Sequence, residues 1–250
     1  MEKSCDKKRK KEPLMSISDH VSAVQQRVAA AARAAGRDPA EVTLCAATKV
    51  QTSDTIRQAI AAGITVCGEN RVQEMTAHLA DDAYRGAALH FIGHLQTNKV
   101  KQVVGKVALI HSVDSLHLLQ AINAQAEKLG IVQDILIEVN IGEEASKGGI
   151  AAGEAMELAL QTQALDHVRL RGLMAIPPPV EHPEENRPFF IAMRQLFVDI
   201  KQKINDNKND IDCLSMGMSG DYEEAIAQGA TLVRVGTALF GPRPPMATHQ

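Results

Sequence analysis

Eight short apolar segments alternate with amphipathic segments along this chain, and this alternation restricts its fold more than any other feature. The apolar segments have the length and the β-branched composition of buried strands, and glycines close most of the helices between them. The predicted strands are residues 42–49, 64–68, 89–93, 109–113, 134–140, 169–176, 211–216 and 231–235. Eight such strands in a chain of 250 residues predict a closed parallel (β/α)8 barrel of the α/β class. A doubly wound open sheet is the alternative.

A further helix is predicted over residues 17–35, before the first strand, whereas only residues 237–240 can form a helix after the last one. Because the first and eighth strands are neighbours in a closed barrel, we expect the leading helix to fill the place of the missing last helix. The predicted organisation is one barrel domain over residues 15–245, a disordered basic tail over residues 1–14 and a short tail over residues 246–250.

Composition excludes several classes of function. A net charge of −3 argues against a nucleic-acid-binding surface, and no apolar run has the length of a membrane span. The cysteines are dispersed, which predicts buried thiols in a reducing compartment and hence a cytoplasmic protein. No third ligand accompanies His90 and His94, so no metal site is expected. We expect a monomer or weak dimer.

Lys49 ends the first predicted strand, and a lysine at the end of an apolar strand suggests a functional role. In a barrel of β-α units the carboxyl ends of the strands face the ligand, and burying an amine there costs free energy. Burial lowers the pKa of an amine, and the neutral amine is the form that makes a Schiff base with an aldehyde. Lys49 is therefore the predicted attachment point of an aldehyde; a lysine whose side chain merely extends to solvent is the alternative.

The loops after the seventh and eighth strands have the composition of a phosphate site. Residues 216–221, which begin with Met216, contain two glycines and place Ser219 just before a predicted helix. We expect Ser219 to be the N-cap of that helix, whose free backbone amides suit a dianion. Gly236 and Thr237 add a glycine and a hydroxyl after the eighth strand. In a closed barrel both loops lie beside the first strand, opposite Lys49.

Arg234 is predicted to point into the barrel. In the eighth strand Val233 and Val235 are expected to face the helices, so the alternation of side chains turns Arg234 inward. An inward guanidinium needs an acceptor, either a protein group such as Glu138 or Glu69, or a ring nitrogen of a ligand. An amine for an aldehyde, amides and hydroxyls for a phosphate, and an arginine for a ring nitrogen together match pyridoxal 5′-phosphate.

Motifs on which a family resemblance rests are spread through the chain. They are Thr-Lys at 48–49, Gly-Glu-Asn-Arg-Val-Gln-Glu at 68–74, Phe-Ile-Gly-His-Leu-Gln-Thr-Asn-Lys at 91–99, Ser-Lys-Gly-Gly at 146–149, Met-Gly-Met-Ser at 216–219 with Asp221, Arg-Val-Gly-Thr at 234–237 and Phe-Gly at 240–241. At these residues the chain resembles the pyridoxal phosphate homeostasis proteins, which are similar to the N-terminal domain of alanine racemase. The resemblance covers about residues 15–244 and implies a pyridoxal-phosphate-binding TIM barrel of fold-type III.

The resemblance also implies the residues of the site. They are Lys49 for the internal aldimine, Ser219, Gly236 and Thr237 for the phosphate, Arg234 for the pyridine nitrogen, and Asn70 and Met216 in the pocket. The family usually has serine before the lysine and threonine after it, whereas Thr48 and Val50 stand there in this chain. The basic tail is a second departure, and neither affects the amine itself.

The implied function is a pyridoxal 5′-phosphate-binding protein of intracellular vitamin B6 homeostasis, with pyridoxal-phosphate-dependent enzymes as recipients of the cofactor. Arginine stays charged and cannot accept a proton, so the pyridine nitrogen would remain unprotonated and a weak electron sink. Racemases of this fold use a tyrosine from a second domain, which is not expected here because six residues follow Pro244.

Two other functions stay open. The first is an amino-acid racemase-like enzyme, for which Tyr222, after the phosphate loop, is the candidate catalytic tyrosine. The second is a barrel that binds another phosphorylated metabolite and uses Lys49 as an ion-pair partner. Lys147, in a glycine-rich loop on the ligand side, is expected to be a solvated lysine, with a secondary contact to the aldehyde as the alternative.

Overall fold

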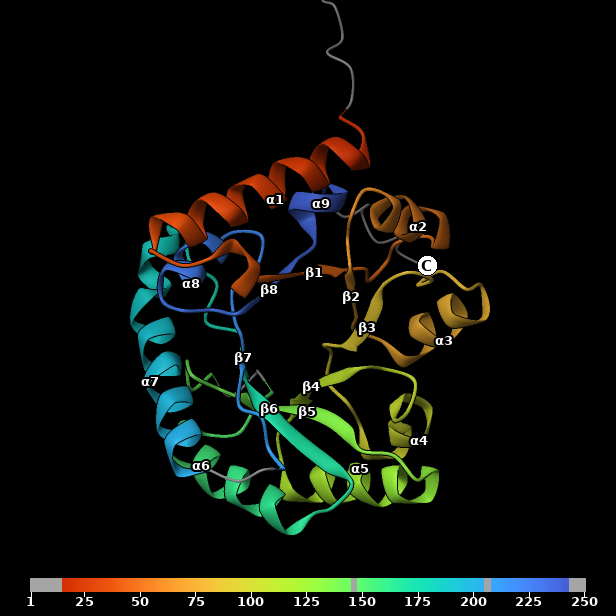
Figure 1. The fold of residues 1–250 in the computed structure, drawn as a ribbon, viewed down its shortest axis with the longest axis vertical. Coiled ribbons are helices and arrows are strands. Elements are labelled where there is room, and N and C mark those ends of the chain that lie inside the picture. The colour runs from red at the N-terminus through yellow and green to blue at the C-terminus, as the bar shows by residue number, and fades with distance from the viewer. Residues whose placement is uncertain (1–14, 145–147, 205–207, 243–250) are drawn as a thin grey trace, which may run out of the picture.

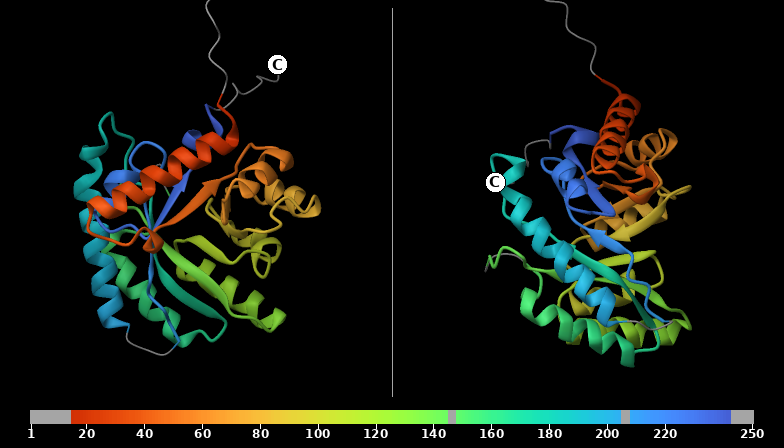
Figure 2. Two further views of the ribbon diagram at one scale, coloured as in Figure 1. Left: turned by 45° about the horizontal axis from the view of Figure 1, so that its top comes forward. Right: turned by 60° about the vertical axis from the view of Figure 1, so that its left-hand side comes forward.

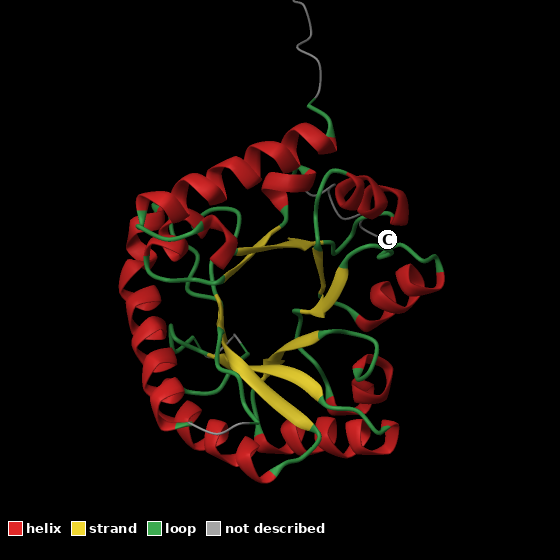
Figure 3. Ribbon diagram, viewed as in Figure 1, coloured by secondary structure: helices red, strands yellow, loops and turns green. Residues whose placement is uncertain are grey.

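A computed structural model describes residues 15–144, 148–204 and 208–242 and shows a closed barrel of eight strands inside a ring of helices (Figures 1 and 3). The strands are β1 (Thr43–Ala47), β2 (Val66–Glu69), β3 (Ala88–Phe91), β4 (Leu109–Val113), β5 (Gln133–Val139), β6 (Val168–Ala175), β7 (Cys213–Ser215) and β8 (Leu232–Val235). All neighbouring pairs are parallel, and β1 pairs with β8 as well as with β2. The predicted barrel is therefore confirmed, and the open sheet is wrong.

Helices follow the strands around the outside of the barrel. The α-helices are α1 (Ile17–Ala34), α2 (Ser53–Ala61), α3 (Val72–Ala80), α4 (Val100–Val103), α5 (Leu116–Leu129), α6 (Ala152–Gln161), α7 (Arg187–Lys203), α8 (Tyr222–Ala227) and α9 (Thr237–Phe240). The 3₁₀ helices are η1 (Pro39–Glu41), η2 (Thr97–Lys99), η3 (Thr162–Ala164) and η4 (Pro183–Asn186). None of the described helices combines the length and the apolar character needed to cross a membrane.

The main hydrophobic core lies between the barrel and its helices, and the barrel interior is filled separately. In β8, Val233 and Val235 belong to the outer core, whereas Leu232 packs inside the barrel with Cys45 and Val66. This alternation follows from the two-residue period of a strand.

The leading helix closes the ring of helices. It contacts α2, α8 and α9, so it covers the junction of β1 and β8, as predicted (Figures 1 and 2). Ser16 caps it in a capping box with Asp19, in which each side chain accepts the backbone N–H of the other residue. At the other end, Arg37 donates to the carbonyl oxygens of Ile226 and Ala230, at 3.1 and 2.8 Å. These contacts attach the segment after α1 to the end of α8.

Some predicted boundaries differ from the structure. The helix predicted over residues 97–104 is divided into η2 and α4, because β-branched residues and Gly105 leave room for only one regular turn. The seventh strand is shorter than predicted: its three residues pair with β6, and it pairs with β8 at Ser215 and Leu232. The predictions for residues 1–14 and 246–250 fall outside the described residues.

The described cysteines are free thiols, two of them buried and one, Cys213, half-buried. Burial, together with Glu69, raises the pKa of Cys67 to about 12, and burial and Asp212 raise the pKa of Cys213 to about 12. These thiols therefore stay protonated and unreactive near neutral pH.

Candidate functional site

A pocket of about 230 Å³ lies at the carboxyl ends of β1 and β8. Its lining residues are Ala47, Lys49, Val50, Gln51, Met218, Ser219, Gly220, Arg234, Gly236, Thr237, Phe240 and Gly241. The structure thus brings the predicted residues Lys49, Ser219, Arg234, Gly236 and Thr237 into one pocket. The pocket lies where the first and last strands of the barrel meet, because β1 pairs with β8.

The strand that precedes Lys49 ends earlier than predicted, at Ala47, and residues 49–50 form a turn. Thr48 is held on β2, because its backbone N–H donates to the carbonyl oxygen of Gly68 at 2.9 Å. On the other side, the backbone N–H of Val50 donates to Glu74 Oε2 at 3.0 Å. Lys49, half-buried, therefore projects from a turn that is fixed at both of its neighbours.

A buried carboxylate, Glu69, fixes this turn from the side of the helices. Its Oε1 accepts hydrogen bonds from Thr48 Oγ1 at 2.6 Å and from the hydroxyl of Tyr84 at 2.9 Å, and His78 Nδ1 lies 3.2 Å away. Burial, followed by Glu69, raises the pKa of Tyr84, so the phenol remains a donor. Thr48 thus supplies a hydroxyl at the position where the family usually has serine.

The phosphate corner differs from its prediction in one detail. The N-cap of α8 is Asp221, whose Oδ1 accepts the backbone N–H of Met218 at 2.7 Å. Ser219 was predicted as that cap and is not. Its Oγ instead accepts the backbone N–H groups of Gly236 and Ala238, at 3.1 and 3.3 Å. The hydroxyl therefore joins the loop after β7 to the start of α9.

Several backbone donors remain available at this corner. The N–H groups of Ser219, Gly220 and Thr237 have no acceptor among the described residues, and all three residues line the pocket. Backbone N–H groups that converge at a loop before a helix are a common way to bind phosphate. The corner therefore fits an anionic phosphate ester.

Arg234 points into the barrel, as predicted, and is 4% exposed. Its Nη1 donates to the carbonyl oxygen and to Oγ of Ser215, at 2.9 and 2.5 Å, and its Nη2 donates to the carbonyl oxygen of Ala175 at 2.9 Å. The predicted carboxylate partners are wrong: Glu69 binds Thr48 and Tyr84, and Glu138 forms no hydrogen bond with Arg234 among the described residues. Because these acceptors are neutral, no ion pair within the described part of the chain cancels the guanidinium charge.

Two predicted site residues lie outside the pocket. Met216 is buried in the outer core, since it follows the inward-facing Ser215 and so takes the opposite side of the strand. Asn70 follows β2 at the same end of the barrel, and its buried Oδ1 has no hydrogen-bond partner among the described residues.

The sequence prediction missed other lining residues, among them Val50, Gln51 and Phe240. Phe240 and Gly241 belong to one of the family motifs, and that motif could have indicated that Phe240 lines the pocket.

Neither tyrosine of the chain lines the pocket. Tyr222 is 1% exposed, belongs to the outer core and has the guanidinium of Arg27 over its ring at 5.5 Å from the centroid. Tyr84 is bound to Glu69. The candidate catalytic tyrosine of the racemase alternative, Tyr222, is therefore directed toward α1 and away from Lys49.

The remaining candidate residues, His90 and His94, do not form a second binding site within the described residues. No group of three metal-binding side chains comes together within the part of the chain that the structure describes. Lys147 lies outside the described residues. His90 is inside the barrel, where it pairs with another histidine rather than with His94.

Comparison with known proteins agrees with this geometry. Residues 20–244 match the family model described as the N-terminal domain of alanine racemase. The chain is 44% identical over 229 residues to the pyridoxal phosphate homeostasis protein of Aquifex aeolicus, an alignment that covers 92% of this chain and 99% of the relative.

Solved structures show the same fold. The structure of PipY from Synechococcus elongatus with PLP bound has a TM-score of 0.78 and 31% identity, covering 90% of this chain and all of PipY (100%). Alanine racemase from Clostridium difficile, at 13% identity and a TM-score of 0.68, shares the fold over 57% of its own chain. The chain therefore belongs to the alanine racemase N-terminal domain family and, within it, to the pyridoxal phosphate homeostasis proteins.

Proposed function

We propose that this chain binds pyridoxal 5′-phosphate as a Schiff base of Lys49 and serves intracellular homeostasis of the cofactor. One observation carries the proposal: an amine, a set of backbone N–H groups without acceptors and a charged guanidinium line the same pocket. Relatives that cover nearly the whole chain are named pyridoxal phosphate homeostasis proteins, and PipY has been solved with PLP bound. Both findings support the proposal.

Each residue has a defined part in binding. The bound cofactor supplies an aldehyde, a phosphate and a pyridine ring. Lys49 would supply the neutral amine that an aldehyde needs to form a Schiff base. The backbone N–H groups of Ser219, Gly220 and Thr237, close to Gly236, would hold the phosphate. Arg234 would face the pyridine nitrogen as a hydrogen-bond donor and would leave it unprotonated.

The same residues favour a carrier over a catalyst. A pyridine nitrogen that meets a permanently charged donor cannot be protonated by it, which weakens the ring as an electron sink. Among the described residues that line the pocket, there is no tyrosine and no histidine to move a proton at an amino acid's α-carbon. We infer that the protein holds and releases the cofactor for pyridoxal-phosphate-dependent enzymes in the cytoplasm, as a monomer or weak dimer.

A spectrum tests the proposal. Purified protein mixed with pyridoxal phosphate should develop a visible absorption band, and borohydride should remove it while fixing the cofactor to the chain. Lys49→Ala should abolish both results. Lys101→Ala, which removes an exposed lysine of α4, is the matched control and should bind as the unmodified protein does. An unchanged band in Lys49→Ala would contradict the covalent mode, and no uptake by the unmodified protein would favour another phosphorylated ligand.

Isotope exchange tests the racemase alternative. The loaded protein is incubated with each amino acid in deuterated water, and exchange of the α-hydrogen is followed by mass spectrometry. We expect no exchange above that of free pyridoxal phosphate. Stereospecific exchange at an enzyme-like rate, lost in Lys49→Ala, would replace the carrier function with catalysis.

A further inference from the structure

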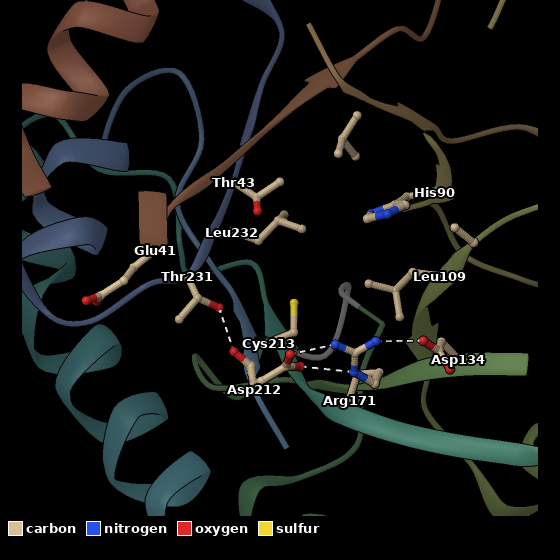
Figure 4. A pocket seen from close by; sticks show the side chains of 12 residues that line it. Glu41, Thr43, His90, Leu109, Asp134, Arg171, Asp212, Cys213, Thr231 and Leu232 are labelled. Carbon is tan, nitrogen blue, oxygen red and sulfur yellow. Dashed lines mark hydrogen bonds and ion pairs between the residues drawn. The ribbon is translucent and has the colours of Figure 1, made fainter. Parts of the chain in front are cut away.

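A second and larger cavity opens at the opposite end of the barrel. It has a volume of about 360 Å³, and its walls come from the amino-terminal halves of the strands (Figure 4). We call it the lower cavity; Figure 4 shows Thr43, Leu232, His90, Leu109 and Cys213 around it. Arg171 lies across one side, where Nη1 donates to Asp134 at 2.8 Å and Nη2 to Asp212 at 2.5 Å. These ion pairs satisfy the charges of this wall.

A chain of hydrogen bonds crosses the barrel between this cavity and the cofactor pocket. His90 Nδ1 lies 3.0 Å from His111 Nε2, and His111 Nδ1 lies 3.0 Å from Ser215 Oγ. Ser215 Oγ accepts from Arg234 Nη1 at 2.5 Å. His90 lines the lower cavity, whereas Arg234 lines the cofactor pocket. These hydrogen bonds therefore connect β3 and β4 with β7 and β8 through the interior of the barrel.

The direction of each hydrogen bond follows from Arg234. A guanidinium can only donate, so Ser215 Oγ accepts from it, and the serine proton is directed to the other partner, His111 Nδ1. His111 then carries its proton on Nε2 and donates to His90 Nδ1. His90 in turn carries its proton on Nε2, which has no acceptor among the described residues. This assignment gives the hydroxyl of Ser215 and the Nε2–H group of His111 one acceptor each.

Both imidazoles are neutral at physiological pH. Burial, followed by the charge of Arg171, lowers the pKa of His90 to about 4, although Asp134 opposes the shift. Burial, then His90 and Arg234, lower the pKa of His111 well below its usual value. A neutral imidazole keeps one donor and one acceptor nitrogen, which this arrangement requires. Protonation would put a second positive charge into the chain that ends on Arg234.

We propose that Ser215, His111 and His90 are positioning residues for Arg234, which orient its guanidinium toward the cofactor ring and extend its hydrogen bonding to the lower cavity. The inference rests on the proposed function, because Arg234 matters to the cofactor only if the cofactor binds beside Lys49. Of these three residues, Ser215 is the one that contacts Arg234; His111 fixes the hydroxyl of Ser215, and His90 fixes the tautomer of His111. A residue of the lower cavity thereby influences a pocket that it does not reach.

Substitution of His111 tests this series of hydrogen bonds directly. His111→Leu removes the acceptor of Ser215, whereas the side-chain amide of His111→Gln can accept from Ser215 and donate to His90. With pyridoxal phosphate as the probe, we expect His111→Leu to weaken binding about tenfold, the effect of one lost buried hydrogen bond. The pH midpoint of the visible band should rise by about half a unit or more, because a displaced guanidinium no longer opposes positive charge on the cofactor. His111→Gln should restore most of both properties.

His90→Leu keeps the test decisive if the buried leucine at position 111 prevents folding. The lower cavity leaves room for this side chain. We expect the pH midpoint of the visible band to rise, but by less than in His111→Leu. Thr43→Val is the matched control, since it changes the wall of the same cavity without touching the chain, and should leave the band unchanged. If leucine and glutamine at position 111 behave alike, or if Thr43→Val shifts the midpoint as much as His90→Leu, the inference is wrong. Absence of any band in the unmodified protein would instead contradict the proposed function.

Discussion

Val50, next to the proposed attachment lysine, has a backbone conformation that its side chain disfavours. Its φ is 58°, in the left-handed region where a β-branched residue is strained, and its side chain is 48% exposed. The hydrogen bond from its N–H to Glu74 holds the turn in this shape. The strain is located where the chain must leave β1 and direct Lys49 into the pocket.

Val50→Asn should therefore stabilise the cofactor-free protein. Asparagine tolerates the left-handed region better than valine, and we expect the free energy of unfolding in urea to rise by about 1 kcal/mol. Val132→Asn is the control, because Val132 is 53% exposed and has no positive φ. An equal loss of stability in both variants would show that the turn is unstrained.

Glu138 is a second residue whose environment has a measurable consequence. It is 8% exposed, and burial, then Asp114, raise its pKa to about 7, while Arg234 acts in the opposite direction. The folded protein thus holds this proton more tightly than the unfolded chain does. The resulting stabilisation is complete below the ordinary pKa of 4.5 and is lost as the pH rises through about 7.

Glu138→Gln imitates the protonated side chain at every pH. We expect the cofactor-free variant to be more stable than the unmodified protein by about 2 kcal/mol at pH 8.5 and equally stable near pH 4, measured by urea unfolding. The control, Glu127→Gln, removes an exposed carboxylate of α5. A difference that does not vary with pH would contradict the assignment of a raised pKa to Glu138.

At the scale of elements, the site depends on how closely the loop after β7 approaches α8. Gly217 has a φ of 92°, and a Cβ atom there would lie 2.5 Å from Ala225 Cβ and 3.0 Å from Tyr222 Cα. Its carbonyl oxygen accepts the backbone N–H of Arg234 at 3.0 Å, so the loop is also bound to β8. Glycine is required because the loop must pass between a helix and a strand.

Gly217→Ala should lower the free energy of unfolding by about 2–3 kcal/mol and weaken cofactor binding, because both the backbone angle and the contact with α8 must change. Gly220→Ala lies in the same loop and meets no atom within 4 Å. It should change the stability of the cofactor-free protein by no more than about 0.5 kcal/mol. Similar losses in both variants would mean that close packing on α8 does not shape this loop.

The whole molecule shows which features a sequence can predict. Period-two alternation in β8 was enough to direct Arg234 inward, and the same rule places Met216 outside, against the motif that suggested it. The partner of Ser219 could not be predicted, because its hydroxyl binds amides in the next loop rather than its own helix. The His90–His111–Ser215 chain depends on barrel closure, which brings inward positions of distant strands together.

Mapping of the modified lysine shows directly whether Lys49 forms the Schiff base with pyridoxal phosphate. The protein is loaded with pyridoxal phosphate, reduced with borohydride, digested and analysed by mass spectrometry. We expect one stoichiometric pyridoxyl adduct, on the peptide that contains Lys49. An adduct on another lysine, with Lys49 unmodified, would contradict it.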